Sequence, residues 1–124
     1  GPAGHLGRLI AWDAASGKVA WGVDEPLPVY AGVLATAGGV VFYGTLDKTF
    51  KAVDASTGKV LFQTTLECGV VGNPISYTAP DGHQRIAIYS GVGWLAGGFA
   101  GGTCYGNAAH GAGQGGVLHV FKLP

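Results

Sequence analysis

A motif of thirteen residues that occurs twice constrains the fold more than any other feature of this sequence. LIAWDAASGKVAW begins at Leu9 and FKAVDASTGKVLF begins at Phe50, so the copies align without a gap at an offset of 41 residues. Asp13 corresponds to Asp54, and Trp21 corresponds to Phe62. A repeat of about 40 residues is typical of folds that set similar supersecondary units side by side.

Each copy of the motif predicts a β-hairpin. Strand-favouring residues flank an Asp-x-x-x-Gly turn, in which Asp bonds the backbone two residues on and Gly supplies a positive φ. We expect no amphipathic helix. The strands expected in the two hairpins and between them are 8–12, 18–22, 32–37, 40–44, 49–53, 59–65, 74–78 and 85–90. Four strands in about 41 residues correspond to one blade of a β-propeller.

The end of the chain carries a third copy of the first strand without its turn. LHVFK, at 118–122, resembles LIAWD and FKAVD but follows a glycine-dense stretch. We therefore divide the single domain, 1–124, into blade repeats near 8–48 and 49–90, a glycine-rich loop at 91–116 and a closing strand at 117–123. Because propellers need about four to eight blades, we expect a C-terminal fragment of a larger propeller, or a chain that associates to cover its apolar faces.

Composition narrows the classes of function. Charged residues make up only 11% of the chain and hydrophobic residues 48%, which favours burial on several sides. Seven basic residues balance seven acidic ones, so we expect no nucleic-acid partner. No apolar run reaches the ~18 residues of a transmembrane helix, so we expect no membrane span. The first residues do not form a signal peptide, which leaves the compartment open.

The motif Ala-x-Asp-x-x-(Ser/Thr)-Gly-Lys-x-x-Trp resembles the tryptophan-docking motif of the pyrroloquinoline quinone (PQQ) dehydrogenases. In that family the Trp of each blade stacks between the Ala of its own motif and a glycine peptide of the next blade. The resemblance gives these roles to Trp21 and Ala11. Phe62 departs from the pattern, since it keeps an aromatic ring but lacks the indole N–H.

A longer stretch resembles the same family more specifically. PLPVYAGVLATAGGVVFYGTLDKTFKAVDASTGKVLF, at 26–62, is similar to the penultimate blade of methanol and ethanol dehydrogenase large subunits, including the lanthanide-using branch. GVVGNPISYTAPDG, IAIYSGVGW and GGVLHVFKLP continue the likeness to their C-terminus. The resemblance implies an all-β fold made of the last blades of an eight-bladed β-propeller with tryptophan-docking motifs.

The resemblance also implies three cofactor-binding residues. In the family a Gly-Trp pair lines the PQQ pocket on the ring axis, and here that pair is Gly93-Trp94, although the family reads GVGGW and this chain GVGW. Glycine lets the backbone approach a flat anionic cofactor, and the indole supplies a rigid wall with one donor. Tyr30 stands where the family tends to have Trp. The alternatives are an aromatic plug for Trp94 and a packing role for Tyr30.

The chemistry implied for the parent protein is oxidation of a small primary alcohol to an aldehyde by PQQ, with Ca²⁺ or a lanthanide as Lewis acid. Cytochrome c would take the electrons, in the periplasm. The family's metal ligands and catalytic base lie upstream, so we assign no catalytic or metal-binding residue to this chain. The competing hypotheses are a non-enzymatic propeller scaffold or interaction module, and a ring built from copies of this chain.

Two cysteines, Cys68 and Cys104, lack zinc-site spacing. In a protein whose family is periplasmic they favour a disulfide, and the alternative is two buried free thiols. The four histidines form no metal-binding pattern, and Asp13 and Asp54 are interpreted as turn-forming residues.

Overall fold

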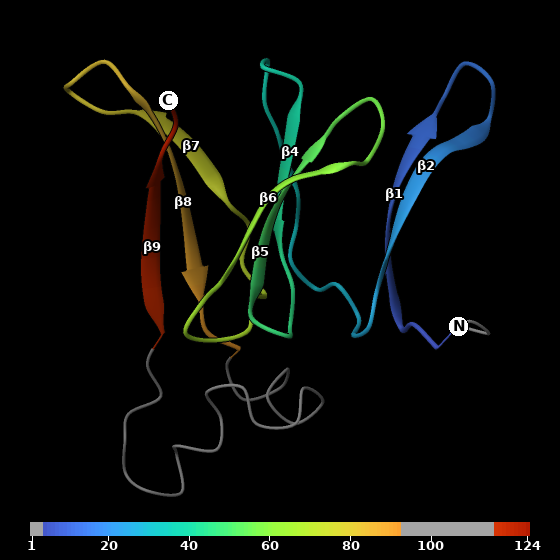
Figure 1. Ribbon diagram of the computed structural model, residues 1–124, viewed down its shortest axis with the longest axis horizontal. Coiled ribbons are helices and arrows are strands. Elements are labelled where there is room, and N and C mark those ends of the chain that lie inside the picture. Colours follow the sequence, from blue (N-terminus) through green and yellow to red (C-terminus); the bar gives the residue numbers. More distant parts are fainter. Residues whose placement is uncertain (1–3, 93–115) are drawn as a thin grey trace, which may run out of the picture.

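The structure, a computed structural model, describes residues 4–92 and 116–124, which form nine β-strands. Figure 1 shows three antiparallel sheets standing side by side, which we call the first, second and third sheets. The first sheet is β1 (Gly7–Asp13) and β2 (Lys18–Glu25). The second is β3 (Leu34–Ala35), β4 (Val40–Gly44), β5 (Thr49–Asp54) and β6 (Val60–Thr65). The third is β7 (Ile75–Thr78), β8 (Gln84–Ser90) and β9 (Val117–Lys122).

The predicted all-β fold is confirmed, and the described residues contain no helix. It follows that none of these residues belongs to a helix suited to crossing a bilayer. The strand before the Thr-Ala-Gly-Gly turn at 36–39 is shorter than expected, since 34–35 replaces 32–37. The N–H of Gly32 bonds a side chain instead of a strand, and Thr36 already begins the turn by accepting a hydrogen bond from Gly39.

The two copies of the motif fold alike. Asp13 accepts hydrogen bonds from the N–H of Ala15 and the hydroxyl of Ser16, and Asp54 is bonded in the same way within its own turn. The ladder shifts register between Ala11 and Trp12 and again at the matching positions of the second copy. The repeat in the sequence is thus a repeat in the backbone, bulge included.

The repeats and the sheets are out of phase. Residues 8–48 run through the two strands of the first sheet and continue into β3 and β4 of the second. Residues 49–90 likewise supply β5 and β6 of the second sheet and then β7 and β8 of the third. Each repeat therefore straddles two sheets, and the chain itself ties neighbouring sheets together.

The main apolar core lies between the second and third sheets. Phe50 is 1% exposed, and its ring stacks on that of Phe121 with centroids 4.9 Å apart. The ring of Phe42 also stacks on that of Phe50, with centroids 6.0 Å apart. The other members of this cluster are Ala31, Ala52, Leu66, Val70, Ile86 and Ile88. Burial of these side chains is the principal apolar contribution to holding the two sheets together.

The strands on either side of the glycine-rich stretch both belong to the third sheet. β8 and β9 pair from Ser90 with Val117 to Arg85 with Lys122. The hydroxyl of Ser90 lies 2.8 Å from Nε2 of His119, on the neighbouring strand. Ser90 and Val117, which stand before and after the glycine-rich stretch, are therefore partners on adjacent strands.

Large apolar side chains remain exposed on the two outer sheets. They include Leu6, Ile10, Trp12 and Val19 on and next to the first sheet, and Ile75, Tyr77, Leu118 and Val120 on the third. Exposed apolar surface on this scale is unusual for a self-contained domain. It agrees with the expectation, drawn from the composition and the repeat, that these sheets need neighbours.

Candidate functional site

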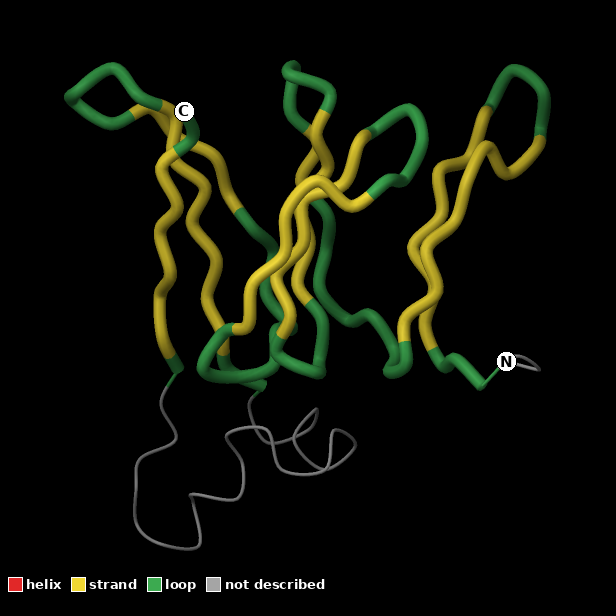
Figure 2. The backbone as a smooth tube through the Cα atoms, viewed as in Figure 1, coloured by secondary structure: helices red, strands yellow, loops and turns green. Residues whose placement is uncertain are grey.

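The connections that carry the predicted site lie at one end of the sheets. Figure 2 shows the turns 14–17, 36–39, 55–59 and 79–83 at the other end, and the remaining connections below, including the short turn 45–48. We call the lower set the rim. It comprises residues 26–33 between β2 and β3, 45–48 between β4 and β5, 66–74 between β6 and β7, and 91–92 after β8.

Hydrogen bonds join the segments of the rim to one another. The N–H of Gly32 donates to Oδ1 of Asn73 at 2.8 Å, which links the connections leading into the second and third sheets. Gly91 donates to the carbonyl of Gly69 at 2.8 Å, and Val70 to that of Thr45 at 2.9 Å. The rim is therefore one bonded layer and not a set of separate loops.

Tyr30 is the one predicted cofactor-binding residue that the structure describes. It lies in the rim between Val29 and Ala31 and is 54% exposed, so its ring is accessible to a ligand. Gly93 and Trp94 lie outside the described residues. The residue before them, Val92, is buried and follows Gly91, which is bonded into the rim.

Of the two cysteines, the structure likewise describes one and not the other. Cys68 is 3% exposed and lies in the rim segment 66–74. Cys104 lies outside the described residues. The proposed pairing of these two residues therefore stays a prediction.

The predicted docking role of Trp21 is confirmed. Its indole Nε1 donates to the carbonyl of Ala55, on the second sheet, at 2.9 Å. Gly58 has φ +73°, and a Cβ added there would lie 2.6 Å from the Trp21 ring. Ala11 is the cross-strand partner of Trp21. The indole thus lies between its own Ala and a glycine of the next sheet.

Phe62 stands at the position that corresponds to Trp21, but it does not make the contact that Trp21 makes. It pairs with Ala52 as Trp21 pairs with Ala11, yet it is 47% exposed. Its ring meets Phe121 edge-on at 6.1 Å. No glycine turn lies against Phe62 within the part of the chain that the structure describes.

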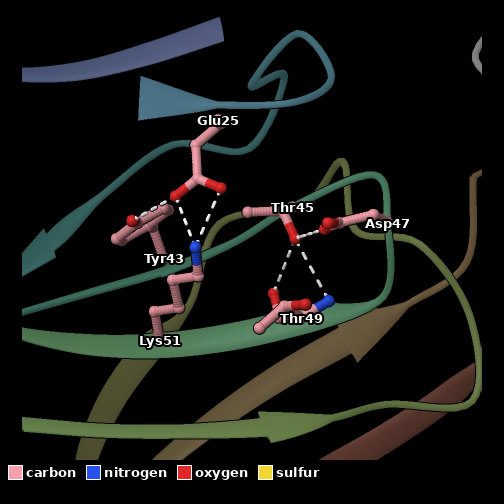
Figure 3. Close-up of polar contacts among 6 residues, drawn as sticks. All are labelled: Glu25, Tyr43, Thr45, Asp47, Thr49 and Lys51. Carbon is pink, nitrogen blue, oxygen red and sulfur yellow. Dashed lines mark hydrogen bonds and ion pairs between the residues drawn. The ribbon is translucent and has the colours of Figure 1, made fainter. Parts of the chain in front are cut away.

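A buried ionic cluster in the same region was not foreseen from the sequence. Glu25, the last residue of β2, is 1% exposed and receives Nζ of Lys51 at 2.7 and 2.8 Å on its two oxygens. The hydroxyl of Tyr43 donates to Glu25 Oε1 at 2.6 Å (Figure 3). Burial, followed by the hydrogen bond to Glu25, raises the pKa of Tyr43, so this phenol stays protonated and remains a donor.

The turn beside this cluster is also held by side chains. The hydroxyl of Thr45 accepts the N–H of Thr49 at 3.1 Å and is bonded to the carboxylate of Asp47 (Figure 3). One sequence signal could have pointed to the ionic cluster. Glu25 continues the alternation of Trp21 and Val23 on β2, and an acid at such an inward position needs a cationic partner.

The rim fits one wall of a cofactor pocket through Tyr30, whose aromatic ring is exposed. Two of its glycines are closed in, since a Cβ added at Gly32 would collide with Asn73 and one at Gly91 with Tyr89. Across residues 4–92 and 116–124, no three His, Cys, Asp or Glu side chains come together as metal ligands.

Sheets set side by side and joined by tryptophan docking define a sector of a β-propeller. Residues 25–86, half of the chain, match the family described as "PQQ: Glucose/ethanol/alcohol dehydrogenase, beta-propeller domain". The chain belongs to this family of PQQ-dependent dehydrogenases.

Similar proteins agree with the family. The lanthanide-dependent methanol dehydrogenase of Methylacidiphilum fumariolicum is 52% identical over 89 residues, which cover 72% of this chain and 15% of that protein. Subunit 1 of the methanol dehydrogenase [cytochrome c] of Paracoccus denitrificans is 46% identical over 87 residues, which cover 70% of this chain and 14% of that protein. The solved structure of a europium-containing methanol dehydrogenase matches with a TM-score of 0.80 and 43% identity, over 97% of this chain and 24% of that one. The chain thus spans less than a quarter of each relative.

Proposed function

We propose that this chain supplies neighbouring blades of a PQQ-dependent alcohol dehydrogenase that oxidises a small primary alcohol to an aldehyde. The observation that carries the proposal is the likeness of nearly the whole chain, in fold and sequence, to a methanol dehydrogenase. The remaining blades of an eight-bladed ring would cover the exposed apolar sides of the first and third sheets.

In this proposal Tyr30, Gly93 and Trp94 line part of the cofactor pocket. When bound, PQQ accepts the electron pair of the alcohol, and Ca²⁺ or a lanthanide acts as Lewis acid. The exposed ring of Tyr30 would provide a flat contact surface and one hydroxyl group. The metal ligands and the catalytic base would come from blades upstream of this chain, so these residues bind and orient and do not transfer protons.

Three further features belong to the proposal. Cytochrome c would accept the electrons, as the printed name of the Paracoccus relative indicates for that protein. The protein would work in the periplasm, where disulfides persist. A disulfide between Cys68 and Cys104 would then tether residue 104 to the rim, and the burial of Cys68 in that layer supports this pairing.

The test uses the complete polypeptide that contains these residues, loaded with PQQ and either Ca²⁺ or a lanthanide. We expect oxidation of a primary alcohol with reduction of an artificial electron acceptor. Trp94→Ala should weaken PQQ binding by about tenfold, the loss of about 1.4 kcal/mol of aromatic contact. Trp12→Ala is the matched control, since Trp12 precedes the hairpin turn at the opposite end of the first sheet.

A non-enzymatic scaffold would behave differently. It would bind no PQQ, and Trp94→Ala would then change nothing. The isolated 124-residue chain should neither bind PQQ tightly nor turn over alcohol, because it carries only part of the pocket. Tight binding by this chain alone would contradict the division of roles proposed here.

A further inference from the structure

The first and second sheets are fastened by a side chain that the proposed function does not use. The carboxylate of Glu25 is almost completely buried and accepts three hydrogen bonds, two from Lys51 and one from Tyr43 (Figure 3). Lys51 and Tyr43 are cross-strand partners on β5 and β4, so both project from the same face of the second sheet. That face meets the end of β2.

The position of Glu25 on β2 makes it one of two fasteners. Alternate residues of this strand, from Trp21 through Val23 to Glu25, are the more buried ones, so they face the second sheet. Trp21 docks near the hairpin-turn end, on Ala55. Glu25 docks near the rim end, where the chain leaves the sheet.

Glu25 is also the last residue of β2, directly before the segment that carries Tyr30. Pro26 and Pro28 follow it, and each proline ring restricts φ. The backbone after Glu25 is therefore stiff, so the orientation of Glu25 constrains the residues that follow. The carbonyl of Leu27 lies so close to Gly7 that a Cβ there would collide with it. At the far end Gly32 is bonded to Asn73. Tyr30 thus lies between two anchors.

Energy alone does not explain a charged anchor at this place. Removing two charges from water is costly, and well-packed apolar residues in place of a buried ion pair are often as stable or more stable. The ion pair instead fixes the orientation of the Glu25 side chain. Two bonds from Lys51 and one from Tyr43 fix the carboxylate in one position, whereas apolar contacts allow sliding.

We propose that Glu25, held by Lys51 and Tyr43, is a positioning residue that fixes residues 26–33 and thereby the ring of Tyr30 at the rim. Its effect on cofactor binding rests on the function proposed above. Its effect on the backbone of 26–33 does not, so the two can be tested separately.

The first experiment measures amide hydrogen exchange in the complete polypeptide without added cofactor. We expect Glu25→Gln to raise exchange at the Gly32 amide, whose N–H is bonded to Asn73, by tenfold or more and to leave β8 unchanged. Asp24→Asn is the matched control, because the neighbouring carboxylate is exposed and pairs with Arg8. Unchanged exchange at the Gly32 amide with Glu25→Gln would overturn the proposal, whatever the enzyme does.

An apolar triple variant separates positioning from stability. Glu25→Met, Lys51→Met and Tyr43→Phe together remove both charges and the buried hydroxyl that donates to Glu25, so we expect overall stability close to that of the unmodified protein. Exchange at the Gly32 amide should nevertheless stay at least tenfold faster. If this triple variant restores full protection of that amide, the ionic cluster is only a packing element, and the positioning role is refuted.

The second experiment asks whether Glu25 acts through Tyr30. With PQQ as the probe, we expect Glu25→Gln and Tyr30→Ala each to weaken binding, and their combination to weaken it no more than Tyr30→Ala does. Additive losses would contradict action through Tyr30. If the unmodified protein fails to bind PQQ, the proposed function falls, and the exchange experiment still decides the positioning role.

Discussion

The two interfaces between neighbouring sheets are built in opposite ways. The first and second sheets meet through an indole hydrogen bond from Trp21 and the buried ion pair of Glu25. The second and third sheets meet through an apolar core in which Phe50 stacks on Phe121. Directional contacts determine how two sheets are oriented, whereas apolar burial contributes most of the free energy. The comparison therefore separates the contacts that orient sheets from those that stabilise them.

The largest effect should come from the apolar interface. Phe50→Ala deletes a fully buried ring that stacks with both Phe42 and Phe121, so we expect a loss of about 3–5 kcal/mol in the free energy of unfolding. Urea unfolding followed by near-ultraviolet circular dichroism would measure it. A loss below 1 kcal/mol would mean that the second and third sheets are not held by this core.

A smaller effect should follow from two glycines that share one conformation. Gly58→Ala places a methyl group at φ +73° and against the Trp21 ring, and we expect a loss of about 2–4 kcal/mol. Gly17→Ala meets the same backbone strain at φ +67° with nothing within 4 Å, so about 1–2 kcal/mol should be lost. Equal losses in thermal unfolding would show that docking does not constrain Gly58.

The indole itself should matter at one interface and not at the other. Trp21→Phe leaves the carbonyl of Ala55 without its donor, and we expect a loss of about 1–3 kcal/mol. Phe62→Trp should change stability by less than about 0.5 kcal/mol, because the ring is half exposed and its described contact is with Phe121. A comparable gain from Phe62→Trp would reveal a docking partner for position 62.

The smallest effect should appear in acid. Hydrogen bonds from Ser16 to Asp13 and from Ser56 and Thr57 to Asp54 lower the pKa of both carboxyls below the value near 3.8. A lowered folded-state pKa adds stability that is complete above about pH 4 and is lost as the pH falls through the folded value. Asp54→Asn should flatten the acid dependence of thermal unfolding more than Asp13→Asn does, because the Asp54 carboxylate accepts four hydrogen bonds and the Asp13 carboxylate two. The reverse order would show that these hydrogen bonds do not set the acid dependence.

The sequence alone predicted the structural features that depend on residues close together in the chain. The strands and the Asp-x-x-x-Gly turns follow from alternation, turn chemistry and the 41-residue offset, whereas the docking role of Trp21 was implied by the family resemblance. Tyr30 was assigned through a family resemblance, and the structure places it in the rim. Each of these signals lies within a short stretch of the sequence.

The Glu25 cluster shows why the rest was not predictable. Its partners Tyr43 and Lys51 lie 18 and 26 residues away and on a different sheet. Alternation along β2 places Glu25 on the inward face, but nothing in the sequence indicates which base it will meet, because that depends on how two sheets meet. The shortening of β3 has a similar cause, since the N–H of Gly32 is taken by the side chain of Asn73, 41 residues later.

The pairing of Ser90 with Val117 has a consequence for how such proteins can vary. Because residues 91–116 start and finish on adjacent, hydrogen-bonded strands, inserting or deleting residues between them leaves the pairing of β8 with β9 intact. The entropic penalty grows only with the logarithm of length, at about 0.6 kcal/mol per doubling. Natural variation can therefore change the length and composition of the stretch between Ser90 and Val117 while the paired strands on either side of it stay the same.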